Sequence, residues 1–197
     1  MLLTTAYFPP TEYFAVLARY SEVYLEAHEK YQKQSWRNRC RILTANGPMD
    51  LNFPIVHDGA TGIKDIKVDW STPWLHKTKY AIDSAYYSSP FFEYYRDELF
   101  GILDSRPETL WEMNSRLTEF FCRKIGINPV LKETESFAVP VPGDPEDLRF
   151  TIHPKVPSGY RGREYWQVFK EKFGFVAGLS IMDLLFNEGP ESLCSLR

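Results

Sequence analysis

The chain has 197 residues, enough for one domain with its own core, and 44% of them are hydrophobic, as in a typical globular protein. Its formal net charge of −3 argues against a binder of nucleic-acid polymers, because such a protein needs a basic surface. Aromatic residues make up 16% of the chain, and we expect most of them in the core.

The cysteines and the N-terminus indicate a cellular compartment. Cys40, Cys122 and Cys194 are odd in number and lack a C-x-x-C pair, so we expect free thiols in a reducing environment. The first residues, MLLTTAYFPP, have neither the positive charge nor the apolar run of an export signal. No stretch approaches the roughly 20 apolar residues of a transmembrane helix. The sequence therefore predicts a cytoplasmic protein without a transmembrane segment.

The first 26 residues predict a compact α/β unit. Residues 2–7 read as a short strand that ends at Pro9 and Pro10, because proline cannot continue a strand. Thr11 then begins a short helix with apolar residues at helical spacing. Residues 22–26 predict a second strand, and a strand–helix–strand unit of this kind favours parallel pairing.

A hairpin and a further strand are predicted next. Asn46-Gly47 lies between two alternating runs, and this pair favours a tight turn with positive φ at both residues. Residues 63–69, IKDIKVD, alternate between apolar and charged side chains and predict another strand. The first third of the chain should therefore supply a mixed sheet.

The middle of the chain predicts three helices, over residues 73–86, 90–104 and 107–125. The last should end at Gly126. Apolar stripes on the second and third helices indicate core packing. Each helix follows a capping residue close to a proline, namely Thr72, Ser89 and Ser105.

Residues 140–163 predict a long loop, because they contain five prolines and three glycines. A short strand is expected only at 148–152. Long loops inside compact domains often act as lids over a site, and the alternative is a solvated surface excursion. The charged or titratable residues of this loop are Arg149, His153, Lys155, Arg161 and Arg163.

Two last helices are predicted, over residues 163–173 and 179–186. Gly174 should end the first of them, and the second should end near Gly189. In the second, Ser180 and Asp183 fit a capping box, which favours a structural role for Asp183.

The segment KQSWRNRCRI, residues 33–42, concentrates positive charge. Lys33, Arg37, Arg39 and Arg41 share one face of an extended chain, and three of them also share a face of a helix. Like charges at this spacing repel unless an acidic patch or an anionic ligand faces them. Arginine suits phosphate and carboxylate, so the segment predicts a site for a phosphorylated, nucleotide-linked or carboxylated small molecule.

Glu26 and His28 follow the second predicted strand, and open α/β sheets bind ligands at strand ends. His28 is a candidate proton acceptor, with Glu26 as its orienting partner. The alternative is a hydrogen-bonded histidine at the rim of the sheet. Cys40 could pair with His28 for acyl transfer, but a strand would turn Cys40 away from the arginines and favours a buried structural cysteine.

Several common chemistries lack their motifs in this sequence. The four histidines stand singly, without H-x-x-x-H or C-x-x-C companions, so no metal set is predicted. A glycine-rich phosphate loop and the G-x-S-x-G nucleophile motif are also absent. The sequence identifies no cofactor.

Four segments of the chain resemble the WbqC-like protein family of bacteria. They are TAYFPPTEYF, KQSWRNRCRI with its ANGP turn, AYYSSPFFEYYRDEL and LSIMDLLFNEGPES. The resemblance extends from Leu3 to Ser192. The residues that fit the family pattern are Lys33, Asn38, Arg39, Asp183 and Asn187.

This resemblance implies a role in the biosynthesis of surface polysaccharides such as O-antigen, with transfer of an amino acid such as glycine as the suggested activity. The chain departs from the family pattern at two places. Thr4–Tyr7 lacks the histidine that many members have after the first strand, and Ala27-His28 stands where many members have an acidic pair.

We therefore expect one α/β domain over residues 1–197, with a mixed sheet from the N-terminal third and helices from the rest of the chain. The leading hypothesis is a transferase of glycan-precursor synthesis that moves an aminoacyl or acyl group to an amino sugar. The alternative is a non-catalytic binding module whose basic cluster pairs with its own Asp50, Asp65 or Asp69. The predicted catalytic residues are His28 and Glu26, and the predicted substrate-binding residues are Tyr7, Tyr13, Lys33, Arg37, Asn38, Arg39 and Lys155.

Overall fold

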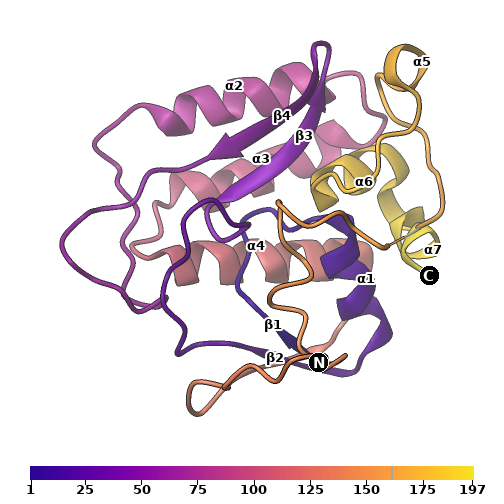
Figure 1. Cartoon of the computed structure of the whole chain (residues 1–197). Helices are drawn as coiled ribbons and strands as arrows, with labels where there is room; N and C mark the ends of the chain where they lie inside the picture. Colours follow the sequence, from indigo (N-terminus) through magenta and orange to yellow (C-terminus); the bar gives the residue numbers. More distant parts are fainter. Residues whose placement is uncertain (161) are drawn as a thin grey trace.

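The computed structural model describes residues 1–160 and 162–197, so Arg161 of the long loop lies outside the described residues. The structure contains helices and two small sheets (Figure 1), which confirms the predicted α/β fold class. The elements in chain order are β1 (Leu2–Leu3), α1 (Thr11–Arg19), β2 (Glu22–Leu25), β3 (Arg39–Thr44), β4 (Gly47–Asn52), α2 (Trp74–Tyr86), α3 (Phe92–Asp104), α4 (Leu110–Ile125), β5 (Val130–Glu133), α5 (Lys170–Phe173), α6 (Ile181–Glu188), a 3₁₀ turn (Gly189–Glu191) and α7 (Ser192–Leu196).

The first sheet contains three parallel strands in the order β1, β2, β5. In the central strand Tyr24 lies opposite Leu2 of β1, and Glu22 lies opposite Val130 of β5. Residues of β2 alternate between exposed and buried, so the sheet turns one face to the core. The predicted parallel pairing of the first two strands is confirmed, but the third strand comes from beyond the N-terminal third.

The second sheet is an antiparallel hairpin of β3 and β4, so the predicted mixed sheet is divided in two. The hairpin turns where predicted, with Thr44 paired to Gly47. Positive φ occurs at Gly47 but not at Asn46, so the turn is not the predicted type.

Residues 63–69 do not form the predicted strand. Lys67 makes only an isolated bridge to Thr109, and Val68 makes only an isolated bridge to Ile55. Neither partner belongs to a strand, because Thr109 caps α4 and Ile55 lies in a loop. The alternating pattern is nevertheless used, since Ile63, Ile66 and Val68 are all buried.

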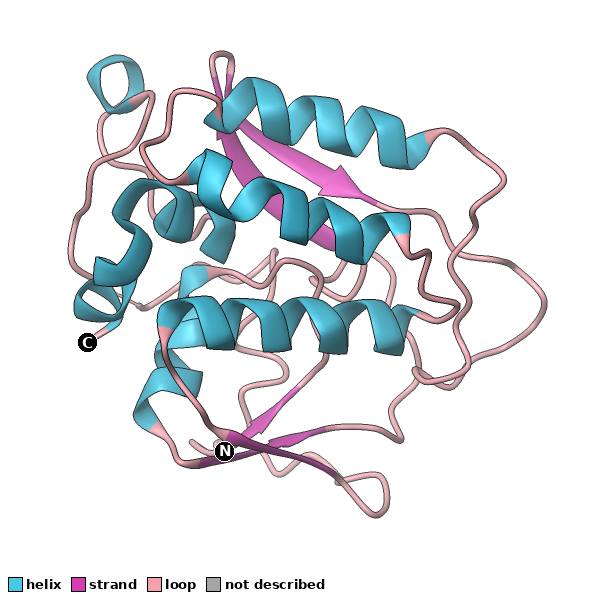
Figure 2. Cartoon of the chain, turned by 180° about the vertical axis from the view of Figure 1, so that it is seen from behind, coloured by secondary structure: helices cyan, strands magenta, loops and turns pink. Residues whose placement is uncertain are grey.

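The three long helices α2, α3 and α4 run side by side (Figure 2) and end at the predicted residues, Tyr86, Asp104 and Ile125. Their starts are less accurate, because α2 and α3 have no side-chain cap and the cap of α4 is Thr109, not Ser105. Gly126 ends α4 with a φ of 81°, as its position predicted.

The C-terminal part differs most from the prediction. Of residues 163–173 only Lys170–Phe173 are helical, and residues 148–152 form turns instead of a strand. By contrast, Ser180 caps α6 as predicted, because its side chain accepts a hydrogen bond from the backbone N–H of Met182.

The core is continuous and aromatic. Phe121 of α4 packs edge-on against Phe8 and Phe14, with ring centroids 6.1 and 5.9 Å apart. Cys40 and Cys122 are buried thiols and Cys194 is exposed, and none of the three forms a disulfide. Among the described helices, none is both long and apolar enough to cross a membrane.

Candidate functional site

A cleft opens where residues 153–160, here called the strap, pass beside the hairpin and α1. Its volume is about 350 Å³, inside the range of about 300–1,000 Å³ that is typical of small-molecule sites. We call it the cationic cleft. Six of the residues that line it carry its chemistry: Glu12, Trp36, Arg41, His153, Lys155 and Tyr160.

The cleft has more positive than negative charge. Arg41 binds Asp50 through two hydrogen bonds of 2.7 and 3.2 Å, and Arg39 reaches the same carboxylate at 3.4 Å. Two arginines thus share one carboxylate, and of the two only Arg41 lines the cleft. Lys155 adds a second positive charge to the cleft, against the single carboxylate of Glu12.

His153 is a neutral donor in this cleft. Its Nδ1 accepts a hydrogen bond from the backbone N–H of Lys155 at 3.2 Å, so the neutral ring carries its proton on Nε2. Burial lowers the pKa of His153, and the charges of Arg37 and Lys155 lower it further. The imidazole is therefore suited to donate a hydrogen bond from Nε2 to an anionic oxygen at neutral pH.

Glu12 is the acidic member of the cleft, and it comes from the first turn of α1. The Ser158 hydroxyl of the strap donates a hydrogen bond to its carboxylate. Burial raises the pKa of Glu12, although the bond from Ser158 opposes this shift. A half-buried carboxylate with a raised pKa is a better proton acceptor than an exposed one.

Trp36 forms part of the cleft floor. Its side chain is 7% exposed, and the Arg41 guanidinium lies 5.8 Å from its ring centroid, within cation–π range. The Nε1–H of Trp36 has no hydrogen-bond acceptor among the described residues.

Arg37 does not join the exposed basic face that the sequence predicted. Its side chain is 2% exposed and binds Glu29 through hydrogen bonds of 2.8 and 2.5 Å. The backbone carbonyl of Arg37 also accepts a hydrogen bond from Asn114 of α4. The residues before β3 form turns instead of an extended chain, so Arg37 and Arg41 point to different surroundings.

Asn38 and Arg39 follow Arg37 in the sequence and make separate contacts. Asn38 Nδ2 donates a hydrogen bond to the Phe53 carbonyl at 2.9 Å, which fixes the start of the hairpin. Arg39 acts through Asp50, as described above, and does not line the cationic cleft. Lys155 is thus the one predicted substrate-binding residue that lines it.

Glu26 and His28 lie at the carboxyl end of β2, as predicted, but they do not interact as predicted. The Glu26 carboxylate accepts a hydrogen bond from the backbone N–H of His28, not from its ring. The His28 Nε2–H donates to the Thr134 carbonyl at 2.9 Å, which leaves Nδ1 able to accept a proton. Glu26 itself is fully buried and binds Arg149 at 2.9 Å. Its role is therefore to join the long loop to the sheet.

The two tyrosines predicted to stack on a ligand belong to the core. Tyr7 is fully buried against Phe8 and Phe53, and Tyr13 donates a hydrogen bond to the Thr4 carbonyl at 3.0 Å. The proline turn between them folds both rings inward. They are accordingly not available to stack on a sugar or a base.

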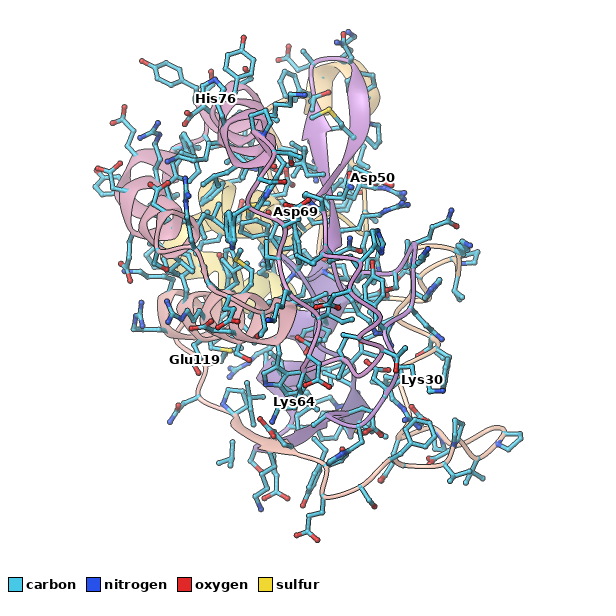
Figure 3. The ribbon with its side chains drawn as sticks, turned by 90° about the vertical axis from the view of Figure 1, so that its left-hand side faces the viewer. Lys30, Asp50, Lys64, Asp69, His76 and Glu119 are labelled. Atoms are coloured by element: carbon cyan, nitrogen blue, oxygen red, sulfur yellow. The ribbon has the colours of Figure 1, made fainter. Side chains whose placement is uncertain are left out.

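Lys33 lines a different pocket, of about 450 Å³, together with Lys30 and His57. Figure 3 shows Lys30 on the loops below the hairpin, well apart from Asp50. The predicted basic cluster is therefore divided: Lys33 lines this pocket, Arg37 is buried, and Arg39 and Arg41 share Asp50, with only Arg41 in the cationic cleft.

Sequence reasoning missed Glu12, Trp36 and His153 as members of one site. Glu12 gave a weak signal, since an acidic residue in the first turn of a helix is common for helix stability alone. His153 was singled out only as part of the long loop. Their meeting depends on how that loop crosses α1, which no local pattern encodes.

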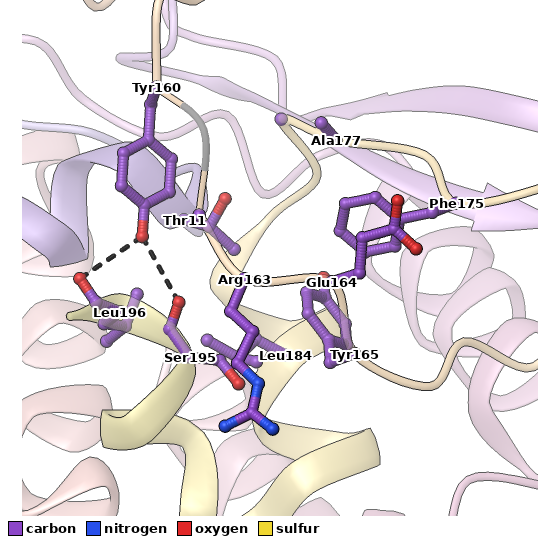
Figure 4. A pocket seen from close by; sticks show the side chains of 12 residues that line it. Thr11, Tyr160, Arg163, Glu164, Tyr165, Phe175, Ala177, Leu184, Ser195 and Leu196 are labelled. Carbon is purple, nitrogen blue, oxygen red and sulfur yellow. Dashed lines mark hydrogen bonds between the residues drawn. The ribbon is translucent and has the colours of Figure 1, made fainter.

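Two further cavities border the strap. One, of about 250 Å³, lies beneath residues 162–165 between the last helices (Figure 4). Tyr160 stands at its edge, and its hydroxyl contacts the carbonyls of Ser195 and Leu196 at 3.4 and 3.3 Å. The other, of about 990 Å³, lies between α1 and the loop, and we call it the apolar groove. It shares Glu12 and Tyr160 with the cationic cleft.

Asp183 of α6 is a buried carboxylate that forms no ion pair with any described residue. Its Oδ2 accepts hydrogen bonds from the Tyr165 hydroxyl and from Gln167 Nε2, both at 2.8 Å. Burial raises the pKa of Asp183 to about 6, against the effect of these two donors. Only the backbone N–H of Asp183 bonds to Ser180, so its side chain is not the predicted half of a capping box.

The fold and the cleft define an α/β protein with a small cleft lined by more positive than negative side chains. The model of the WbqC-like protein family matches residues 5–156, a range that includes every charged residue of the cationic cleft. The chain therefore belongs to the WbqC-like protein family, as its resemblance implied. It is similar to an uncharacterised protein of Mycobacterium tuberculosis, with 26% identity over an alignment of 224 positions that covers 100% of this chain and 96% of that protein. No solved structure gives a significant match.

Proposed function

We propose that the protein is a transferase of bacterial surface-glycan precursor synthesis that moves an acyl or aminoacyl group, glycyl among the latter, to an amino sugar. One observation carries this proposal: Arg41, His153 and Lys155 meet Glu12 in a single cleft, although the loop and the hairpin are more than a hundred residues apart in the chain. Positive side chains beside a carboxylate of raised pKa suit a small anionic or nucleotide-linked substrate with an amine to be deprotonated.

In this proposal each residue has a separate task. Arg41 and Lys155 bind the anionic part of the substrate, and the Nε2–H of His153 donates to an oxygen on which negative charge develops. Glu12 accepts the proton of the attacking amine, and Ser158 holds its carboxylate in place. We propose Glu12 for this task in place of His28, since Glu12 is the one of the two that lines the cleft.

The binding half of the proposal is tested by thermal shift with nucleotides, nucleotide sugars, sugar phosphates and aminoacyl donors. A ligand at about one hundred times its Kd adds about 2.7 kcal/mol, which raises Tm by about 5–10 °C for a chain of this size. Lys155→Ala and Arg41→Ala should remove the shift. Arg39→Ala is the matched control, because Arg39 shares Asp50 with Arg41 but does not line the cleft.

The catalytic half is tested by mass spectrometry of the amino-sugar product with the bound donor and acceptor. Glu12→Gln should bind substrate normally and reduce turnover by about a hundredfold or more. Turnover that is unchanged in Glu12→Gln would reject the assignment of Glu12. A shift that persists in both Lys155→Ala and Arg41→Ala would reject the cleft itself.

A second candidate is a non-catalytic module that binds a glycan precursor or a partner enzyme. It is favoured by the internal pairing of Arg39 and Arg41 with Asp50, which was the expectation of that hypothesis. Ligand binding without product formation for any donor and acceptor pair would select this candidate over the transferase.

A further inference from the structure

The apolar groove is the largest of the cavities described above, and most of the residues that line it are apolar, although Glu12, Arg19 and Arg197 line it too. One wall is the face of α1 that carries Ala15 and Val16, and the other is the loop with Leu148, Ile152 and Val156. Its volume of about 990 Å³ lies at the upper end of the range for small-molecule sites. An apolar surface of this extent favours an aliphatic ligand, because each methylene moved from water into it is stabilised.

The groove and the cationic cleft adjoin each other. Glu12, Val156, Pro157 and Tyr160 line both cavities and so form the boundary between them, where Ser158 of the strap bonds to Glu12. At this junction the surroundings change from positively charged to apolar. The shape and charge together match a molecule with an anionic end and an aliphatic end.

We propose that the apolar groove holds the linear aliphatic chain of an acyl donor whose phosphate-bearing carrier binds in the cationic cleft. This inference rests on the proposed function and narrows the transferred group to a fatty acyl group. The reacting carbonyl then lies at the junction, next to Glu12. The length of the groove selects among donors, and the cleft recognises the carrier that they share.

The reaction at the junction balances for a thioester donor and an amine acceptor. The amine nitrogen attacks the thioester carbonyl, a C–N bond forms, and the C–S bond breaks. Glu12 takes the proton that the nitrogen loses and returns it to the leaving thiolate, so the products are an amide and a thiol. No oxidant or reductant is required.

The experiment measures the affinity of the full chain for acetyl-, butyryl-, octanoyl- and dodecanoyl-coenzyme A by isothermal titration calorimetry. Each additional pair of methylenes should tighten binding roughly tenfold until the groove is filled. Ala15→Trp should abolish this dependence on chain length and leave the affinity for acetyl-coenzyme A unchanged. Ala81→Trp is the matched control, because Ala81 is also a half-buried helical alanine packed against the core but lies on α2.

A second variant keeps the test valid if Ala15→Trp does not fold. Ile152→Asp on the opposite wall should also remove the dependence on chain length, and thermal melts should show that both variants are folded. Equal affinity for acetyl and dodecanoyl donors in the native chain would overturn the inference. So would a dependence on chain length that survives in both variants.

Failure of the proposed function gives a different pattern. Sodium dodecanoate, which has no carrier phosphate, tests the groove by itself, and nucleotide sugars test the cleft by themselves. If dodecanoate binds the native chain but not Ala15→Trp, and no nucleotide or coenzyme A binds either protein, the groove inference stands without the transferase. If nucleotide sugars bind and dodecanoate does not, the transferase proposal stands without the fatty acyl donor.

Discussion

At the scale of single residues, position along the chain does not determine what an arginine does. Arg37 and Arg41 are four residues apart, yet one is 2% exposed against Glu29 and the other is 37% exposed against Asp50. A buried pair is costly to break, because the remaining charge loses both its partner and water. An exposed pair is screened by solvent and contributes little.

Glu29→Ala should therefore lower the free energy of unfolding by about 3–5 kcal/mol, since it leaves the guanidinium of Arg37 buried and unpaired. Asp50→Ala removes an exposed partner of Arg41 and should cost less than about 1 kcal/mol. Urea denaturation of both variants measures the difference. Equal losses in the two variants would contradict the assignment of Arg37 to the core.

Asp183 makes stability depend on pH in the direction opposite to a salt-bridged carboxylate. Its pKa is about 6 in the folded chain, above its value of 3.8 in the unfolded chain, so between these values only the folded state holds the proton. The contribution of Asp183 to stability is thus present below pH 4 and is lost as pH rises through 6. Between pH 4 and 6 the contribution of Asp183 to the free energy of unfolding changes by up to about 1.4 kcal/mol per pH unit.

Asp183→Asn should remove this pH dependence, because an amide oxygen can still accept from Tyr165 and Gln167. The variant should gain stability relative to the native chain as pH rises from 4 to 6. Urea denaturation at several pH values gives the difference between the two proteins. A difference that does not change with pH would show that Asp183 ionises normally.

At the scale of elements, helices α3 and α4 contain two glycines with opposite energetic roles. Gly101 lies inside α3, and Gly126 ends α4 with a φ of 81°. Apart from the adjacent residues and the helix's own backbone, no described heavy atom lies within 4 Å of the position that a Cβ would take on either one. Any effect of replacing them therefore comes from the backbone and not from a clash.

Gly126→Ala should lower the free energy of unfolding by about 1 kcal/mol, because alanine is strained at positive φ. Gly101→Ala should raise it by about 0.5–1 kcal/mol, because alanine favours the interior of a helix. Thermal or urea unfolding of the two variants gives the signs. The same sign in both would contradict the ends assigned to these helices.

The sequence predictions were accurate where a local pattern determines the structure and wrong where tertiary contacts determine it. The ends of α2, α3 and α4 were predictable because apolar periodicity and a terminal glycine are local. Residues 163–173 were not, because Tyr165 and Gln167 bond to Asp183 instead of continuing a helix. Residues 63–69 have a strand pattern but meet no extended partner. Tertiary contacts decided both cases.

At the scale of the whole molecule, one buried network joins the long loop to the parallel sheet. Arg149 of the loop binds Glu26 at the end of β2 and also binds Asp147. Beside it, the backbone of Leu2 bonds to Glu146 and Leu148, so the loop extends the edge of the sheet. The strap that lines the cationic cleft starts only four residues later, and its position depends on this anchor.

Glu26→Ala should release the loop, because the buried guanidinium of Arg149 and the backbone N–H of Ala138 both lose an acceptor. We expect proteolysis within residues 140–160 to become about tenfold faster or more. Limited digestion followed by mass spectrometry measures the rate and the cut sites. Glu133→Ala, which breaks an exposed pair with Lys64, is the control and should not change the rate.

The site was less predictable than the fold because it is assembled from distant segments. Lys155 was predicted and lines the cleft, but the sequence gave no reason to place it beside Glu12. The histidine that lines the cleft is His153, whereas His28, predicted from its place after a strand, bonds to Thr134. Local patterns identify chemically capable residues, and only the path of the loop selects among them.

The unequal burial of the three cysteines gives this protein a natural labelling site. Burial raises the pKa of the Cys40 and Cys122 thiols, so they should resist alkylation, whereas the exposed Cys194 should react with a maleimide. Cys194 immediately precedes Ser195, one of the two residues whose carbonyls contact Tyr160 of the strap. A single fluorophore, attached without any mutation, would thus stand beside the element that covers the proposed site and report when it moves.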